Sequence, residues 1–329
     1  MGTCRKELEL KSSTKLGSVK QKFSHHSFSI VDADVCAPFQ WFGFQMIRRL
    51  KGLIARQPLV QKATGCWAAA PNPDQWVFVI GCYNSGTTLL DRIIQAHPAV
   101  SGLPIEGAFM SDALPVPEEF GWTRMWHRCE DQMNLPPEAP DASERAARIK
   151  RQWAPWFTDA SPILVEKSVA NACRISFLDS HFRPARFIHI VRNGYAVSEG
   201  IRRKARPGAW NNPMYDDSYP ISLCAKQWAR SMEAVASKLG VAQKHIELKY
   251  ESLVQSPSRE LKRIADFLGI DSFPNDIADK TWSIHGTCSK LADRNPQSIA
   301  SLTREDIRTI ENVAGPWLDH HGYKPDETS

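Results

Sequence analysis

Short apolar runs alternate with helix-like stretches from about residue 75 onward. The first run covers Trp76 to Ile80, is rich in β-branched and aromatic residues, and leads through a glycine-rich turn into TTLLDRIIQAHP. Similar runs recur at 163–166, 186–191 and 245–250, each followed within a few residues by a helix-like stretch. Strands that alternate with helices imply right-handed crossovers and a parallel sheet. The pattern predicts an α/β fold of three layers, with helices on both faces of a central parallel sheet.

Two segments interrupt this alternation. Residues 107–160 and 205–220 are rich in proline, tryptophan and charge. Long irregular connections commonly carry binding residues at the rim of a scaffold. We expect both segments to be insertions that cap one edge of the sheet, within a domain spanning 75–325.

Residues 1–74 are expected to form a basic arm and a lead-in helix. The start of the chain is polar and lacks the apolar run of a signal peptide or membrane anchor, and Lys6 stands where a myristoylation signal needs Ser or Thr. We therefore expect a cytoplasmic protein without a transmembrane segment. The stretch 39–60 mixes aromatic and basic residues, as an interfacial helix does, but Pro58 and the short span favour a helix packed on the domain.

Composition narrows the class. The chain has 329 residues, of which 42% are hydrophobic and 23% charged, which excludes collagen-like, coiled-coil, wholly disordered and polytopic membrane proteins. None of the eight cysteines forms a CxxC pair, and no histidines have metal-ligand spacing. We expect reduced thiols in an intracellular protein, and no metal.

The net charge of +5 is unevenly distributed. Residues 1–60 hold ten Lys and Arg against four Asp and Glu, whereas the remaining 269 residues hold 31 against 32. The bulk of the chain is therefore neutral, and no nucleic-acid partner is expected. Within it, residues 183–206 hold seven basic residues against one acid, which indicates an anion site.

The glycine-rich loop that opens the first helix reads GCYNSGTT. The spacing of Gly81 and Gly86 matches that of a nucleotide P-loop, with Thr88 in its Ser/Thr position. Thr87 replaces the P-loop lysine, which argues against a Mg²⁺-dependent kinase. The amides from Asn84 onward still form an anion cradle at a helix N-terminus, although the loop alone also fits an ordinary turn with a Ser/Thr cap.

Arg192 is a second candidate for anion binding. It follows the strand at 186–191 and precedes a helix, so its guanidinium should lie at the carboxyl edge of the sheet beside the first loop. A solvated helix face explains the basic run at 202–204, but it does not explain an arginine at a strand end.

Three motifs now indicate a family. GCYNSGTTLLDRIIQAHP, RFIHIVRNGYAVSEG and YESLVQSPSRELKRIADFLGI together resemble, in this order, the sulfotransferases that depend on 3′-phosphoadenosine 5′-phosphosulfate (PAPS), including bacterial and tyrosylprotein-type members. The resemblance extends from about Trp76 to Tyr323, outside the two insertions. It implies a P-loop-like fold and transfer of a sulfuryl group from PAPS to a hydroxyl or amine of a small-molecule or carbohydrate acceptor, with adenosine 3′,5′-bisphosphate as product.

The resemblance also assigns cofactor roles. It implies that the loop from Tyr83 to Thr88 holds the 5′-phosphosulfate, that Arg192 holds the 3′-phosphate, and that Tyr250 lies near the adenosine. Lys290 is placed over the 3′-phosphate by analogy of position only. The expected cofactor-binding set is Tyr83, Asn84, Ser85, Gly86, Thr87, Thr88, Arg192, Ser198, Gly200, Tyr250, Lys290 and Arg294.

The chain departs from the family pattern in this set. Asn84 stands where the family usually has Lys or Arg, and Gly200 stands where a serine is common, with Ser198 as a candidate substitute. Leu89 replaces the aromatic residue that stacks on adenine in cytosolic members. These changes fit either a variant cofactor pocket or slow or lost activity.

Two residues are candidates for the chemistry, which needs a base for the acceptor and positive charge on the transferred group. By resemblance to tyrosylprotein-type and bacterial members, Glu106 is the base and Lys167, at the end of the strand at 163–166, contacts the sulfuryl group. From the residues alone, two other interpretations stay open. Glu106 would then be a surface glutamate in the turn after Pro104, and Lys167 would pair with Glu166 in solvent.

The acceptor pocket is expected in the first insertion, at Trp122, Arg124 and Trp126. Flat aromatics with arginines suit a sugar, a polyol or a partly anionic small molecule, but tryptophan is also common in cores. Two other functions stay open from the sequence: a P-loop nucleotide kinase or phosphotransferase, and a nucleotide-binding relative without catalysis.

Overall fold

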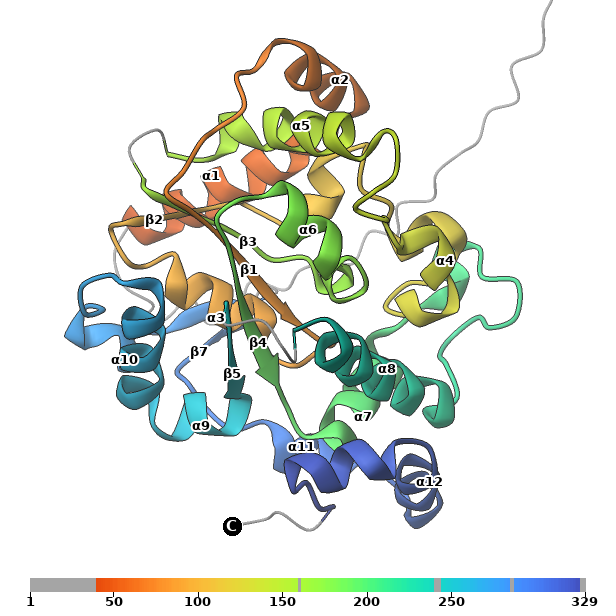
Figure 1. The fold of residues 1–329 in the computed structure, drawn as a ribbon. Coiled ribbons are helices and arrows are strands. Elements are labelled where there is room, and N and C mark those ends of the chain that lie inside the picture. Colours follow the sequence, from red (N-terminus) through yellow and green to blue (C-terminus); the bar gives the residue numbers. More distant parts are fainter. Residues whose placement is uncertain (1–39, 159–160, 240–243, 285–286, 326–329) are drawn as a thin grey trace, which may run out of the picture. The chain divides into compact units, whose positions relative to one another are not determined.

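The computed structural model describes residues 40–158, 161–239, 244–284 and 287–325 (Figure 1). Most of the predicted basic arm lies outside the described residues. A sheet of five parallel strands lies at the centre, in the order β2-β3-β1-β4-β5. Its strands are β1 (Gln75–Gly81), β2 (Val100–Gly102), β3 (Ile163–Glu166), β4 (Ala185–Val191) and β5 (His245–Lys249). The four predicted strands and the parallel sheet are confirmed, and β2 is an additional short edge strand.

The register of the strands sets the position of the site. Phe78 in β1 lies opposite Glu166 in β3 and Phe187 in β4. Because all three strands run in the same direction, their carboxyl ends meet at one edge of the sheet. The residues that follow these strands, among them Lys167 and Arg192, therefore start from the same edge.

Helices cover both faces of the sheet (Figure 1). They are α1 (Gln40–Ala55), α2 (Pro58–Trp67), α3 (Thr87–Ile94), α4 (Glu130–Met133), α5 (Ala142–Trp153), α6 (Ile175–His181), α7 (Gly194–Lys204), α8 (Ile221–Leu239), α9 (Tyr250–Gln255), α10 (Pro257–Leu268), α11 (Asn295–Ile299) and α12 (Arg304–His321). A small antiparallel hairpin, β6 (Trp282–Ile284) and β7 (Thr287–Ser289), follows α10.

Alternate residues of β1 pack into two separate cores, because successive side chains of a strand point to opposite faces. Trp76, Phe78 and Ile80 join the core with α5, α6, α7, α8 and α12. Val77 and Val79 join the other core with α3, α9 and α10. The predicted three-layer α/β/α architecture is confirmed.

The first insertion was predicted to cap an edge of the sheet. In the structure, part of it lies on a face of the sheet instead. Trp153, the last residue of α5, is fully buried, and its ring centroid is 6.2 Å from that of Trp76 and 5.6 Å from that of Phe182. The apolar positions Ala146, Ile149 and Trp153 repeat with helical spacing and are all buried. This stretch therefore completes the core, whereas earlier residues of the insertion line the site described below.

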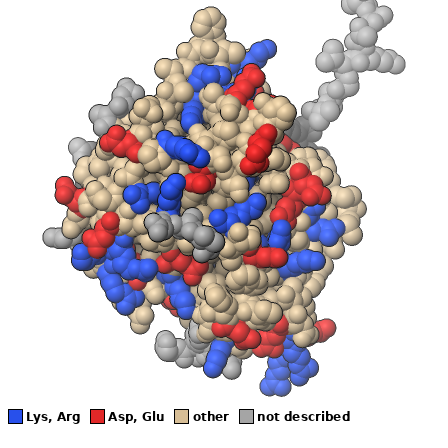
Figure 2. Space-filling model, viewed as in Figure 1, with Lys and Arg blue, Asp and Glu red and all other residues tan. Residues whose placement is uncertain are grey.

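The helix α1 packs on the domain through one side. The Arg48 guanidinium donates to the backbone oxygens of Leu103 and Pro104, and a Cβ on Gly52 would lie 2.7 Å from Ile105. Its other side exposes Met46, Ile47, Leu50 and Leu53. Within the described residues, no helix combines the length and the apolar character needed to cross a bilayer. On the face in Figure 2, basic and acidic side chains are interspersed.

Candidate active site

The loop between β1 and α3 has an unusual backbone. Asn84 has φ 63° and Gly86 has φ 95°, both in the left-handed region. At Gly86 only glycine fits, because a Cβ would lie 2.9 Å from the Tyr250 ring. No side chain caps the start of α3 at Thr87, so its first-turn amides remain available to an anion.

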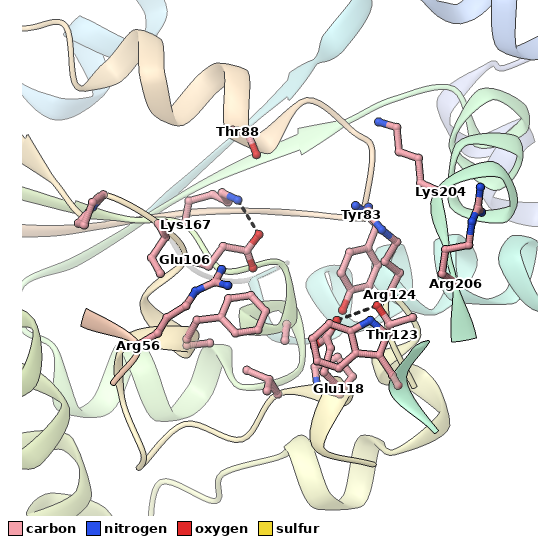
Figure 3. Close-up of a pocket in the computed structure, with 18 of the residues that line it drawn as sticks. Arg56, Tyr83, Thr88, Glu106, Glu118, Thr123, Arg124, Lys167, Lys204 and Arg206 are labelled. Atoms are coloured by element: carbon pink, nitrogen blue, oxygen red, sulfur yellow. Dashed lines mark hydrogen bonds and ion pairs between the residues drawn. The ribbon is translucent and has the colours of Figure 1, made fainter. Parts of the chain in front are cut away.

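Two cavities meet at this loop. The first, of about 520 Å³, lies between the loop, the ends of β4 and α7, and the segment 282–298, and we call it the nucleotide cavity. The second, of about 580 Å³, lies between the loop, α1 and the first insertion, and we call it the acceptor cavity (Figure 3). Five residues line both cavities: Tyr83, Thr88, Glu106, Arg124 and Lys204.

Arg192 lies in the wall of the nucleotide cavity and is held from several sides. Its Nε donates to Asn295 Oδ1 (2.7 Å), its Nη1 donates to the Asn84 backbone oxygen (2.7 Å), and its guanidinium lies 4.4 Å from the centre of the Tyr250 ring. The Asn295 amide in turn donates to Glu251 Oε1 (2.6 Å). Burial lowers the pKa of Arg192, and the nearby Tyr250 and Glu251 oppose this shift.

Two of the departures from the family pattern, Asn84 and Gly200, are neighbours. A Cβ on Gly200 would lie 3.2 Å from the Asn84 side chain, so the small residue leaves room for the amide. The Asn84 Nδ2 atom is buried and has no hydrogen-bond partner among the described residues. A buried amide donor without an acceptor is costly, and a ligand oxygen in the nucleotide cavity would satisfy it.

The two predicted catalytic residues are paired. Lys167 Nζ donates to Glu106 Oε1 (2.6 Å; Figure 3). The Val169 N–H donates to Glu106 Oε2 (3.4 Å). Lys167 is buried, and the Glu106 side chain, which lines both cavities, is 27% exposed. The surface positions that the residues alone left open for both are therefore excluded.

A buried carboxylate behind this pair connects the two segments that carry it. Glu166, fully buried at the end of β3, accepts from the Gly107 N–H (2.8 Å) and from the Ser168 hydroxyl. The Ser168 oxygen in turn accepts from the Ala108 N–H (3.0 Å). Burial raises the pKa of Glu166 to about 7. The network fixes the backbone directly after Glu106.

Other polar residues complete the junction of the cavities. The Thr123 hydroxyl donates to Glu118 Oε1 (3.0 Å), and burial raises the pKa of Glu118. Burial, followed by the charges of Glu118 and Glu106, raises the pKa of Tyr83 well above its ordinary value, so its phenol stays protonated. Burial and the charges of nearby arginines lower the pKa of Lys204 to about 8.

Most predicted cofactor residues come together in the nucleotide cavity. Its lining includes Tyr83, Asn84, Gly86, Thr87, Thr88, Arg192, Gly200, Tyr250, Lys290 and Arg294. Ser85 and Ser198 differ from the prediction, because both are fully buried and neither lines the cavity. The Ser198 hydroxyl donates to the Gly194 backbone oxygen (2.7 Å) within its own helix, so it does not substitute for a serine at 200.

Of the three residues predicted to form the acceptor pocket, one lines the cavities and two do not. Arg124 lines both cavities and has φ 58°, a strained conformation for a residue with a Cβ. Trp126 is fully buried, and Trp122 stacks on Tyr219 with ring centroids 6.1 Å apart. Neither tryptophan lines the acceptor cavity, so the prediction was wrong for both: their apolar rings are used for core packing.

Sequence reasoning missed several residues of the site. Trp282 of the hairpin lines the nucleotide cavity, and Arg56 and Arg92 line the acceptor cavity. Arg56 lies over the Phe109 ring at 4.7 Å and points into the cavity (Figure 3). Two features of the sequence could have pointed to missed residues: Trp282 is a lone tryptophan after α10, and Arg92 follows Thr88 by one helical turn. Among the described residues, no group of three His, Cys, Asp or Glu side chains could hold a metal ion.

Comparison with known proteins gives the family. Residues 75–275 match the family model described as the sulfotransferase family. The chain belongs to this family. The sulfotransferase is therefore a PAPS-dependent transferase. Membership decides against the nucleotide kinase that the P-loop spacing left open, in agreement with Thr87 at the lysine position.

Its relatives act on different acceptors. The sulfotransferase is 25% identical over 278 residues to protein-tyrosine sulfotransferase 1 of Danio rerio, covering 76% of this chain and 72% of the relative. It is 22% identical over 302 residues to the omega-hydroxy-beta-dihydromenaquinone-9 sulfotransferase of Mycobacterium bovis, covering 76% of each. A crystal structure of a Mycobacterium avium sulfotransferase, 14% identical over 85% of this chain and 83% of that one, gives a TM-score of 0.51 and shows the shared fold.

Proposed function

We propose that this sulfotransferase transfers the sulfuryl group of PAPS to a hydroxyl or amine of a small-molecule or carbohydrate acceptor. The observation that supports this proposal is the pair of Glu106 and Lys167 at the junction of the two cavities. A base for the acceptor and a cation for the transferred group are thus side by side, where a nucleotide and an acceptor would meet.

The nucleotide cavity suits a polyanionic nucleotide. Six basic residues line it against the single acid Glu106: Arg124, Arg192, Arg203, Lys204, Lys290 and Arg294. The buried, unpartnered Asn84 amide and the uncapped start of α3 add neutral donors. When bound there, PAPS supplies an activated sulfuryl group and adenosine 3′,5′-bisphosphate is the product.

Each residue has a proposed task. Glu106 accepts the proton of the acceptor hydroxyl, and Lys167 keeps that carboxylate in place and supports negative charge at the transfer position. The amides at the start of α3 and the Asn84 amide bind phosphate oxygens. Arg192, oriented by Asn295, binds the 3′-phosphate. Because these basic side chains supply the positive charge, no metal ion is needed.

We also propose a reducing compartment, the cytosol, for this protein. The six cysteines among the described residues are free, and four of them are buried. Burial raises the pKa of the Cys82 and Cys224 thiols to about 12, so both stay protonated and unreactive.

Transfer of labelled sulfate from PAPS to a panel of phenolic, sugar and aliphatic alcohol acceptors tests the function. We expect turnover by the natural chain, and a loss of at least ~100-fold in kcat for Lys167→Ala with little change in nucleotide affinity. An exposed control, Lys262→Ala, should keep full activity.

Binding of adenosine 3′,5′-bisphosphate without transfer to any acceptor would instead favour the nucleotide-binding relative without catalysis. Equal turnover by Lys167→Ala and the natural chain would remove Lys167 from the mechanism.

A further inference from the structure

The acceptor cavity has a large excess of positive charge. Six arginines, two lysines and two glutamates line it: Arg48, Arg49, Arg56, Arg92, Arg124, Arg206, Lys167, Lys204, Glu106 and Glu118. Only Arg124 and Lys204 of these cations also line the nucleotide cavity. A nucleotide in its own cavity would therefore leave much of this charge without a counterion.

Some of the cations already have partners. Arg48 forms an ion pair with Asp91 at 3.6 Å and donates to Gln95 Oε1 (2.7 Å), and Lys167 pairs with Glu106. Arg206 donates to backbone oxygens of its own segment. Of the cations that line the acceptor cavity and not the nucleotide cavity, Arg49, Arg56 and Arg92 are left without a hydrogen bond or ion pair among the described residues.

Arg92 is the most informative of the three. Its Nε and Nη1 atoms are buried and have no hydrogen-bond partner among the described residues. The preceding Asp91 is already bound by Arg48 and by the Gln95 amide (2.6 Å). A guanidinium with buried, unpaired donors is unfavourable unless a ligand supplies acceptor oxygens.

The position of Arg92 separates it from the transfer point. It follows Thr88 by one turn of α3, about 6 Å along the helix axis. Thr88 lines both cavities, whereas Arg92 lines the acceptor cavity alone. An anion bound by Arg92 would therefore belong to the acceptor and not to the nucleotide.

We propose that Arg92, with Arg49 and Arg56 of the same cavity, forms an oxyanion subsite, so that the acceptor carries a phosphate, sulfate or carboxylate besides the group that is sulfated. This inference rests on the proposed function, because it describes the substrate of that reaction. The apolar Ile105 and Phe109 in the same lining suit the body of such a molecule.

A structural explanation of Arg92 makes a different prediction. The residue lies in the last turn of α3, where a cation stabilises a helix. If this were its role, Arg92→Gln would lower the melting temperature. As an oxyanion subsite waiting for its ligand, the unpaired guanidinium costs stability, and Arg92→Gln should melt at the same or a higher temperature.

Calorimetry on the full chain saturated with adenosine 3′,5′-bisphosphate tests the subsite. The probes are phenyl phosphate, phenylacetate and the neutral benzyl alcohol. We expect the anionic probes to bind more tightly than benzyl alcohol, and Arg92→Gln to weaken their binding by at least about tenfold. The control Arg308→Gln, exposed on α12 and outside both cavities, should bind like the natural chain.

The outcomes are distinguishable. Binding of the anions that is unchanged in Arg92→Gln, or no preference over benzyl alcohol, would overturn the subsite while the bisphosphate still binds. Failure of the bisphosphate itself to bind would overturn the proposed function and the subsite together. A preference between phenyl phosphate and phenylacetate identifies which oxyanion the acceptor carries.

Discussion

Lys204 lies at the end of α7 and lines both cavities. Burial is the largest cause of its lowered pKa, and the positive charges of Arg124, Arg203 and Arg192 lower it further. Such a group of like charges is unfavourable in the free protein, and a bound anion relieves the repulsion. The ammonium of Lys204 thus reports on whether the nucleotide cavity holds an anion.

Nucleotide affinity should therefore depend on pH. In the free protein Lys204 titrates at about 8, and a bound anion raises that pKa because it favours the charged form. Affinity for adenosine 3′,5′-bisphosphate should be full below pH 7 and fall as the pH rises through 8 to 9. Calorimetry at pH 7 and pH 9 measures the change.

Lys204→Arg provides the control, because a guanidinium stays protonated across this range. A natural chain whose affinity falls no more than that of the variant would exclude a role for Lys204 in binding the nucleotide.

The site residues that were easiest to predict from the sequence are those that directly follow a strand. Arg192 and Lys167 each follow an apolar strand, and a parallel sheet brings such positions to one edge. Lys204 and Arg92 lie on helices, where a basic residue is ordinary and periodicity gives no sign of a cavity. Trp126 was assigned wrongly because a sequence does not show whether an indole faces a cavity or the core.

One buried carboxylate, that of Glu166, connects the end of β3 to the segment after Glu106. Glu166 accepts from the Gly107 N–H, and Ser168 accepts from the Ala108 N–H. The backbone that presents Glu106 is thereby attached to the strand end that presents Lys167. This connection fixes the backbone on both sides of the proposed catalytic pair.

This element gives the stability a pH dependence. Glu166 has a pKa of about 7 in the folded protein and an ordinary lower value when unfolded, so between these values the folded state binds the extra proton. Its contribution to stability is thus present at low pH and is lost as the pH rises through 7. The free energy of unfolding of Glu166→Gln, compared with that of the natural chain, should therefore rise as the pH rises from 5 to 8.

Urea unfolding at the two pH values measures this difference, with the exposed Glu138→Gln as the control variant. Parallel pH profiles for Glu166→Gln and the natural chain would show that Glu166 is not protonated in the folded protein.

Elements of regular length were predictable and short ones were not. The runs that became β1, β3, β4 and β5 have four to seven apolar-rich residues, whereas β2 and the strands of the hairpin have three each. Three residues carry no periodicity that separates a strand from a turn. The position of α5 on the sheet face was missed because proline and tryptophan around it suggested an irregular cap.

Across the whole molecule, the charge is arranged around two joined cavities. Both are rich in basic residues, although the chain beyond residue 60 is neutral in sum. Several acids instead pair with basic residues outside the cavities, as Asp112 does with Arg148. The sequence showed only part of this charge arrangement, namely the basic segment 183–206. The cations of α1 and α3 are distant from that segment in the sequence, and only the folded structure brings them to the cavities.

Binding of adenosine 3′,5′-bisphosphate, measured by calorimetry without Mg²⁺ and compared with ADP and ATP, tests the central claim most directly. The bisphosphate should bind more tightly than either and need no Mg²⁺, and Arg192→Ala should weaken it by about 2 kcal/mol, roughly thirtyfold. Tighter, Mg²⁺-dependent binding of ATP, or an unchanged dissociation constant in Arg192→Ala, would contradict the account.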